Sequence, residues 1–349
     1  GQSICDFDYG LALGVQKTFK RLYKKHLFEA LSLLTDVENP KETAETIIGR
    51  VEGETGKCAS LVMDATFEGA IQQELIDLGI EEAVAKRILG YAESSAKADT
   101  DRTTFQAMEA LVHNLNTMHS RAGAQTPFSS INYGMDTSAE GRMVIKNILL
   151  ATEEGLGSGE TPIFPVQIFR VKEGVNYNPG DPNYDLFKLA MRCSAKRLFP
   201  NFSFVDAPFN LQYYKGTPET EISYMGCRTR VMGNVFDNTK EVTCGRGNLS
   251  FTSINLPRIG IEAKGDMKTF YKLLDEKIAL VEEQLLHRFK IQCSKKVYNY
   301  PFLMGQGVWI DSEKLDRNDS VAEVLKHGTL SVGFIGLAET LKALTGKHH

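Results

Sequence analysis

The segment PFSSINYGMDTSAEGRMVIKNILLATEEGLGSGETPIFPVQIFRV, residues 127–171, decides the fold class. Residues 127–133 are compatible with a strand that closes on Gly134. Thr137-Ser138-Ala139-Glu140 fits a capping box, which predicts a helix that runs to Gly155. Residues 163–171 then predict a second strand. A strand, a helix and a strand in this order indicate a parallel α/β arrangement, either a barrel or a doubly wound sheet.

The rest of the chain extends this pattern on both sides. Its apolar periodicity predicts helices over residues 14–36, 41–51, 68–80, 80–95, 103–119, 184–199, 266–291 and 336–344. Further strands are expected over residues 201–205, 249–256 and 329–334. We therefore expect a mainly helical part over 1–119 and a strand-rich part over 120–349, together forming one incomplete catalytic domain. Residues 206–247 are irregular and too long for an idle connection, which favours a functional loop.

Composition and charge exclude several classes of function. The 349 residues carry a net charge of −4, so no electrostatic footprint for a nucleic acid polymer is expected. No apolar run approaches the roughly 18 residues of a membrane span. The six cysteines are scattered without a C-x-x-C pair, which argues against a zinc site or a disulfide framework and favours the reducing cytoplasm. Without an initiator Met, the chain is interpreted as an internal fragment.

Cys227 stands out among these cysteines, because it follows Gly226 and precedes Arg228 and Arg230 inside the irregular loop. A lone cysteine is usually a small buried hydrophobe, but such neighbours do not suit a packed core. The arginines would also favour a thiolate nucleophile, which needs a histidine as base. Spacing alone leaves these readings open.

Five motifs then give a resemblance to a known family. They are residues 113–134 (HNLNTMHSRAGAQTPFSSINYG), 159–169 (GETPIFPVQIF), 197–208 (RLFPNFSFVDAP), 224–234 (YMGCRTRVMGN) and 245–258 (GRGNLSFTSINLPR). Taken in this order they resemble anaerobic, glycyl-radical ribonucleoside-triphosphate reductases. The resemblance is continuous from about residue 101 to the end and weaker over 1–37.

The resemblance implies a ten-stranded α/β barrel, partial in this chain, threaded by a finger loop over about 206–247. Cys227 matches the cysteine that becomes a thiyl radical and takes the 3′ hydrogen atom of a ribonucleoside triphosphate. Formate is the implied reductant. The glycyl radical and the zinc-binding cysteines of the family have no counterpart in this sequence, so the chain alone is expected to be inactive. A homodimer, a radical-SAM iron–sulfur activating enzyme and allosteric control by ATP or deoxynucleoside triphosphates are also implied.

Further site residues follow from the same motifs. Asn248 matches an asparagine beside the substrate hydroxyls and formate, although its glycine neighbours also suit a turn. Met225 is expected to line the pocket, with core packing as the alternative. The remaining predicted residues are the polar substrate-facing set Ser129, Ser130 and Asn132, the phosphate-binding turn Gly333, Phe334, Ile335 and Gly336, and the effector loop Ser120, Arg121, Gly123 and Gln125.

Two other functions stay open at this point. One is a different glycyl-radical enzyme that acts on a small acid or alcohol and binds no nucleotide. The other is a non-catalytic module in which the helical first third dimerises and holds a nucleotide effector.

Overall fold

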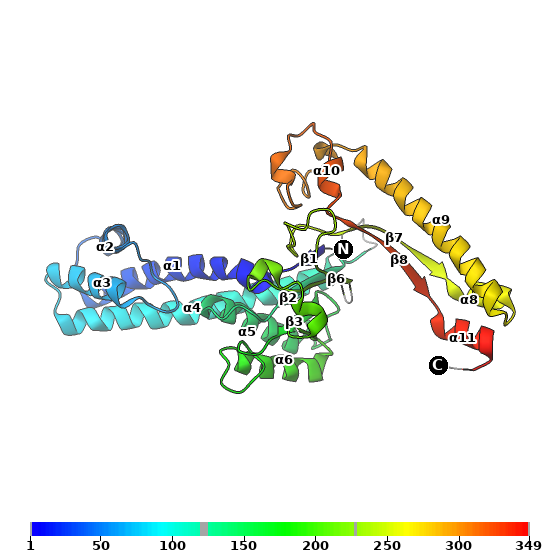
Figure 1. Cartoon of the computed structure of the whole chain (residues 1–349). Coiled ribbons are helices and arrows are strands. Elements are labelled where there is room, and N and C mark those ends of the chain that lie inside the picture. Colours follow the sequence, from blue (N-terminus) through cyan, green and yellow to red (C-terminus); the bar gives the residue numbers. More distant parts are fainter. Residues whose placement is uncertain (1, 119–124, 227–228, 348–349) are drawn as a thin grey trace. The chain divides into compact units, whose positions relative to one another are not determined.

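The computed structural model describes residues 2–118, 125–226 and 229–347 (Figure 1). The chain divides into two compact units, residues 1–230 and 231–349. The boundary between the two units falls inside the predicted finger loop.

A four-stranded sheet organises the first unit. Its strands are β1 (Gln2–Ile4), β2 (Ser129–Tyr133), β3 (Val166–Val171) and β4 (Asn201–Phe204). All neighbours pair in parallel, in the order β1-β2-β3-β4. Every residue of β3 is buried, as expected for an inner parallel strand covered on both faces. The α/β class is thus confirmed, whereas the ten-stranded barrel stays a prediction.

Helices connect these strands and supply most of the first unit. They are α1 (Phe7–Leu34), α2 (Pro40–Thr55), α3 (Ala65–Asp77), α4 (Glu82–Thr117), α5 (Ala139–Glu154) and α6 (Tyr184–Arg197). Figure 1 shows α1 and α4 side by side, with α2 and α3 at the end of this pair distant from the sheet. The helical N-terminal portion is therefore as expected.

Two details differ from the sequence-based expectation. The helices expected over 80–95 and 103–119 are one continuous helix, α4. The Oγ atom of Ser138, rather than Thr137, caps α5 by accepting a hydrogen bond from the Gly141 N–H at 3.0 Å. The Glu140 carboxylate accepts instead from the Leu61 N–H at 3.3 Å, so the capping box is replaced by a tie to the α2–α3 connection.

The predicted loop contains short regular elements. They are α7 (Pro208–Leu211), the 3-10 turn η1 (Pro218–Thr220), β5 (Ser223–Met225) and β6 (Thr229–Val231). β5 and β6 pair with each other, so the chain on the two sides of residues 227 and 228 forms a narrow two-stranded sheet.

A two-stranded parallel sheet forms the base of the second unit. Its strands are β7 (Asn248–Asn255) and β8 (Thr329–Ile335), and between them lie α8 (Leu256–Ala263) and the long helix α9 (Met267–Cys293). The remaining elements are η2 (Val297–Asn299), η3 (Ser312–Lys314), α10 (Ala322–Leu325) and α11 (Leu337–Thr345). Apolar residues of β7, α8 and α9 form one small core, and a second surrounds Trp309.

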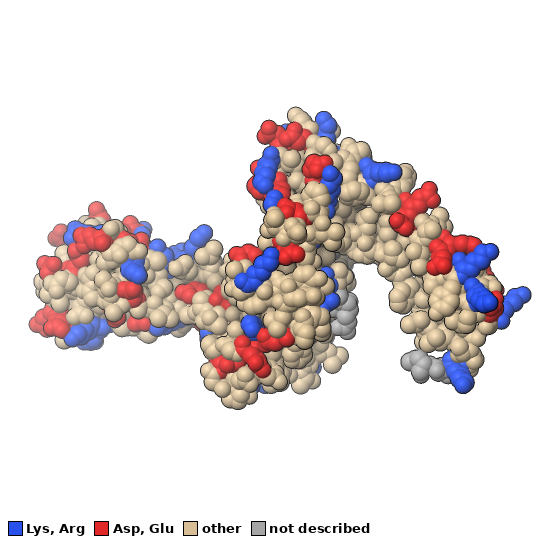
Figure 2. Space-filling model, viewed as in Figure 1, with Lys and Arg blue, Asp and Glu red and all other residues tan. Residues whose placement is uncertain are grey.

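Charged side chains of both signs are interspersed over the face shown in Figure 2. Within the described ranges, no helix is both long enough and apolar enough to cross a bilayer.

Candidate functional site

The polar side chains of β2 hold the strand that leads to Cys227. The fully buried Asn132 amide donates from Nδ2 to the Tyr224 carbonyl at 2.9 Å, and its Oδ1 accepts from the Tyr224 N–H at 2.8 Å. The Ser3 hydroxyl also donates to the Tyr224 carbonyl, at 2.9 Å. Side chains of β1 and β2 thus hold both the backbone N–H and the carbonyl of Tyr224 on β5.

The next contact lies one residue before Cys227. The Ser130 Oγ accepts a hydrogen bond from the Gly226 N–H at 2.9 Å. Gly226 has a φ of +62°, and a Cβ there would lie 3.1 Å from the Phe128 ring. A side chain at 226 would therefore be strained, and glycine allows the turn. Cys227 itself lies outside the described residues.

These contacts define the surroundings of the predicted substrate-facing set. Ser130 and Asn132 share one face of β2, as the alternation predicts, and that face meets the β5 backbone. The Ser129 hydroxyl donates to the Pro127 carbonyl at 3.3 Å. Met225 is half-buried on β5. Contact of these residues with substrate stays a prediction.

A buried ionic cluster lies at the root of the same loop. Arg170 on β3 is fully buried and pairs with three carboxylates: Glu221 at 2.8 Å, Asp6 at 3.3 Å and Asp8 at 3.6 Å. The Tyr9 hydroxyl donates to the second Glu221 oxygen at 3.1 Å. Because Glu221 lies two residues before β5, the cluster ties the loop to β3 and to the start of α1.

Asp8 extends this network to the end of β2. One of its oxygens accepts the N–H groups of Gly134, Met135 and Asp136 at 2.8, 3.0 and 3.1 Å. These bonds compensate the burial of a carboxylate with no exposed surface.

Within the described residues, the Arg170 guanidinium pairs with the carboxylates of Glu221, Asp6 and Asp8. Burial raises the pKa of Glu221 to about 7, while Arg170 acts in the opposite direction. Burial, together with the nearby Glu221 carboxylate, also raises the pKa of Tyr9. Sequence reasoning missed this cluster. Its signal was an arginine within the apolar run V-Q-I-F-R-V (166–171), a buried charge that requires partners.

Asn248 begins β7 in the second unit, and its side chain is exposed. Its Nδ2 donates to the Ser331 Oγ on β8 at 2.7 Å, and its Oδ1 accepts from the Ser250 N–H at 3.2 Å. The side chain is therefore oriented by two neighbours, although it has one face open to solvent. Ser331 belongs to the strand predicted before the phosphate-binding turn, but no role of its own was predicted for it.

The predicted phosphate-binding turn follows Ser331 along β8. Gly333, Phe334 and Ile335 end the strand, and Gly336 is the N-cap of α11 with a φ of +72°. A Cβ on Gly336 would lie 2.2 Å from the Pro257 ring, so only glycine fits. The turn thus places a helix N-terminus on the same ladder as Asn248.

The effector loop is described only in part. Gln125 is exposed shortly before β2, whereas Ser120, Arg121 and Gly123 lie outside the described residues.

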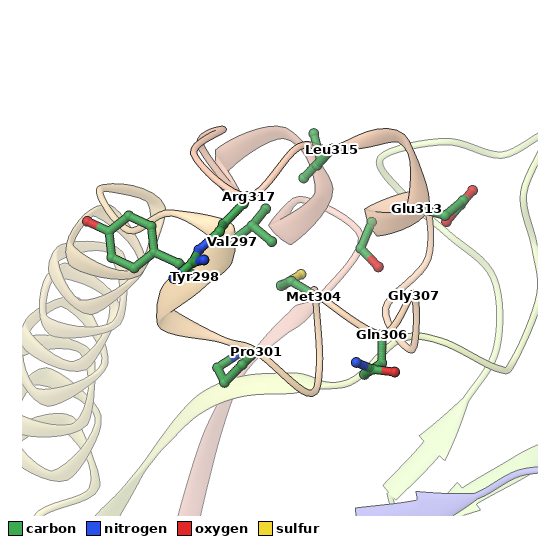
Figure 3. Close-up of a pocket in the computed structure, with 11 residues that line it drawn as sticks. Val297, Tyr298, Pro301, Met304, Gln306, Gly307, Glu313, Leu315 and Arg317 are labelled. Atoms are coloured by element: carbon green, nitrogen blue, oxygen red, sulfur yellow. The ribbon is translucent and has the colours of Figure 1, made fainter.

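An open hollow of about 640 Å³ lies in the second unit, between η2 and η3 (Figure 3). Its lining residues are Val297, Tyr298, Pro301, Met304, Gly305, Gln306, Gly307, Ser312, Glu313, Leu315 and Arg317. The hollow includes none of the predicted site residues. In the part of the chain that the structure describes, no group of three or more His, Cys, Asp or Glu side chains could hold a metal ion.

Comparison with known proteins gives a family match over the whole sequence. The family model described as anaerobic ribonucleoside-triphosphate reductase matches residues 1–349. The chain belongs to this family. One similar relative is the anaerobic ribonucleoside-triphosphate reductase of Escherichia coli K12, which is 36% identical over 261 residues, 74% of this chain and 35% of the relative. Another is the anaerobic ribonucleoside-triphosphate reductase of Enterobacteria phage T4, which is 34% identical over 266 residues, 74% of this chain and 42% of the relative. The chain therefore spans about a third of the length of the Escherichia coli reductase.

Solved structures of the same family are also similar. The anaerobic ribonucleotide reductase of Thermotoga maritima with citrate in the active site has 15% identity and a TM-score of 0.41, covering 88% of this chain and 51% of that one. Its complex with dATP and CTP has 14% identity and a TM-score of 0.41, covering 85% and 45%.

Proposed function

We propose that this chain supplies substrate-reducing residues of an anaerobic ribonucleoside-triphosphate reductase that uses formate. In the overall reaction, a ribonucleoside triphosphate, formate and one proton give the deoxyribonucleoside triphosphate, carbon dioxide and water. Formate loses two electrons, and the 2′ hydroxyl leaves as water. The observation that carries the proposal is the buried attachment of Tyr224 and Gly226 to Asn132 and Ser130, directly before Cys227.

Cys227 is proposed to take the 3′ hydrogen atom of the ribose. Transfer of a hydrogen atom requires sulfur and carbon to be held in near contact, so a fixed backbone before the cysteine favours the reaction. The hydrogen bonds to Tyr224 and Gly226 provide that constraint from one side. A glycyl radical elsewhere in the reductase supplies, when present, the one-electron oxidation of the Cys227 thiol.

Other predicted residues bind and orient. Asn248 is proposed to contact the substrate hydroxyls and formate, since an amide can orient both without titrating. Met225, Ser129, Ser130 and Asn132 are proposed to line the nucleotide side of the site. The turn Gly333–Gly336 is proposed to bind substrate phosphates through backbone N–H groups at the start of α11.

Regulation and partners are proposed from the family. The loop with Ser120, Arg121, Gly123 and Gln125 would respond to ATP or deoxynucleoside triphosphate effectors, and the helical part would serve a homodimer. A radical-SAM iron–sulfur enzyme would generate the glycyl radical, and zinc would bind elsewhere in the reductase. The cytoplasm is the proposed location.

The test is Cys227→Ala in a reductase of full family length that carries this chain, activated anaerobically. The variant should form no deoxynucleotide. Cys58→Ala is the matched control, because Cys58 lies between α2 and α3, outside every predicted site segment. Retained turnover in Cys227→Ala would refute the assignment. An unmodified reductase that forms no deoxynucleotide with formate would refute the proposed reaction.

A further inference from the structure

The Asn248 amide and the Ser331 hydroxyl lie together on the ladder formed by β7 and β8. The Asn248 Nδ2 and Ser331 Oγ atoms are 2.7 Å apart, and the Asn248 Oδ1 receives the Ser250 N–H at 3.2 Å. The ladder is irregular at this point, since its register shifts between Asn248 and Ser250. The shift brings the Asn248 side chain beside Ser331, although its direct backbone partner is Thr329.

The hydrogen bonds determine which way both groups point. A backbone N–H can only donate, so the Asn248 atom that faces Ser250 must be the amide oxygen. The amide nitrogen therefore faces Ser331, whose oxygen must act as acceptor. This leaves the hydroxyl proton of Ser331 and the second amide proton of Asn248, and neither has an acceptor among the hydrogen bonds found within the described residues.

The two donors can be reached from solvent, since Asn248 is exposed and Ser331 is half-buried. Successive residues on one face of a strand are two apart, so Gly333 follows Ser331 on its face of β8. Gly333 pairs with Ser253, and the Ser253 Oγ lies 3.1 Å from the position that a Gly333 Cβ would take, so the surface there is polar. Asn248 is itself exposed.

We propose that Asn248 and Ser331 together form a two-donor subsite for the carboxylate of formate, with Ser331 as the binding residue that the family resemblance does not assign. This inference rests on the proposed function and adds the group that discriminates the co-substrate. Two adjacent donors complement a carboxylate, which accepts through two oxygens, better than a ribose hydroxyl, which also needs to donate. Because neither donor titrates near neutral pH, the subsite keeps its polarity there.

The experiment measures steady-state kinetics in a reductase of full family length that carries this chain. Ser331→Ala should raise the KM for formate roughly tenfold to hundredfold, the range for loss of one hydrogen bond to a charged acceptor. The kcat at saturating formate and the KM for the ribonucleoside triphosphate should stay near the unmodified values. Ser331→Thr keeps the hydroxyl and should largely restore the KM for formate.

Two further measurements separate binding from folding and from chemistry. Ser250→Ala is the matched control: it keeps the N–H that orients Asn248, and its own hydroxyl accepts from Arg288 of α9. It should leave the KM for formate unchanged. Acetate has the carboxylate but no hydrogen on the carboxylate carbon, so its inhibition constant against formate should rise by the same factor in Ser331→Ala.

The outcomes are distinguishable. An active parent whose formate KM is unchanged by Ser331→Ala would overturn this subsite and leave the proposed function intact. If Ser331→Ala raised only the KM for the nucleotide, the formate subsite would also be overturned, and Asn248 and Ser331 would be interpreted as binding the ribose instead. A parent without formate-dependent reduction would instead refute the proposed function.

Discussion

The strand that leads to Cys227 and the strand that begins at Asn248 have very different surroundings. β5 is attached through buried polar groups of β2 and through a fully buried arginine with three carboxylate partners. Asn248 is exposed, and two contacts on a two-stranded ladder orient it. Under the proposed function, a group that takes a hydrogen atom from one carbon gains from a rigid support, whereas a group that binds a small co-substrate needs access. The contrast agrees with a proposed positioning role for the first region and a proposed binding role for the second.

The largest effect is expected from removing the cation of the buried cluster. Arg170→Met removes the guanidinium that pairs with the buried carboxylates of Asp8 and Glu221, so the free energy of unfolding should fall by about 3–5 kcal/mol. Urea denaturation of the chain measures this loss. Arg192→Met is the control, because its pair with Glu153 is largely exposed on the arginine side and should be worth at most about 1 kcal/mol. Equal losses of unfolding free energy in the two variants would show that the buried cluster stabilises the fold no more than an exposed ion pair does.

A smaller effect is expected where the second unit is tightly constrained. Gly336→Ala should cost about 2–4 kcal/mol, since the new Cβ is strained at positive φ and also meets Pro257 at 2.2 Å. Gly346→Ala, at the other end of α11, has the same φ of +72° with nothing within 4 Å. Gly346→Ala should lower the free energy of unfolding only by the cost of a Cβ at positive φ, about 1–2 kcal/mol. Thermal and urea unfolding compare the two variants. Identical losses of stability would show that the contact with Pro257 adds nothing to the cost of the Gly336→Ala change.

The pH dependence of the first unit tests the charge balance of the cluster. The pKa of Glu221 is raised from its ordinary value of 4.5 to about 7, so its protonated form is favoured by folding. Its contribution to stability is therefore complete below pH 4.5 and is lost as the pH rises through 7. Glu221→Gln cannot ionise, so relative to the parent it should gain on the order of 2 kcal/mol between pH 5 and pH 8. A difference that does not change with pH would contradict this.

The sequence predicted local patterns better than long-range partners. The sequence predicted one polar set of Ser129, Ser130 and Asn132, but it could not reveal that Ser130 and Asn132 contact β5, some 90 residues later. Glu221 and Arg170 are likewise 51 residues apart in sequence, and no local pattern joins them.

The break expected within α4 has a similar cause. Ala96 and Thr100 are buried in the stretch between the two expected helices, and Thr104 is buried at the start of the second. Small and polar residues that pack against a neighbouring helix give little apolar periodicity, so the middle of a long helix was not recognised. Ser331 was missed because its importance depends on the register shift that brings Asn248 beside it.

The most direct test compares Asn132→Leu with Ser331→Ala in a reductase of full family length. Asn132→Leu removes both hydrogen bonds to Tyr224, so Cys227 should lose its alignment and kcat should fall about 100-fold with little change in the KM for formate. Ser331→Ala should show the reverse, a higher KM for formate at nearly unchanged kcat. If Asn132→Leu folds normally and keeps its kcat, the claim that β2 positions the cysteine is wrong.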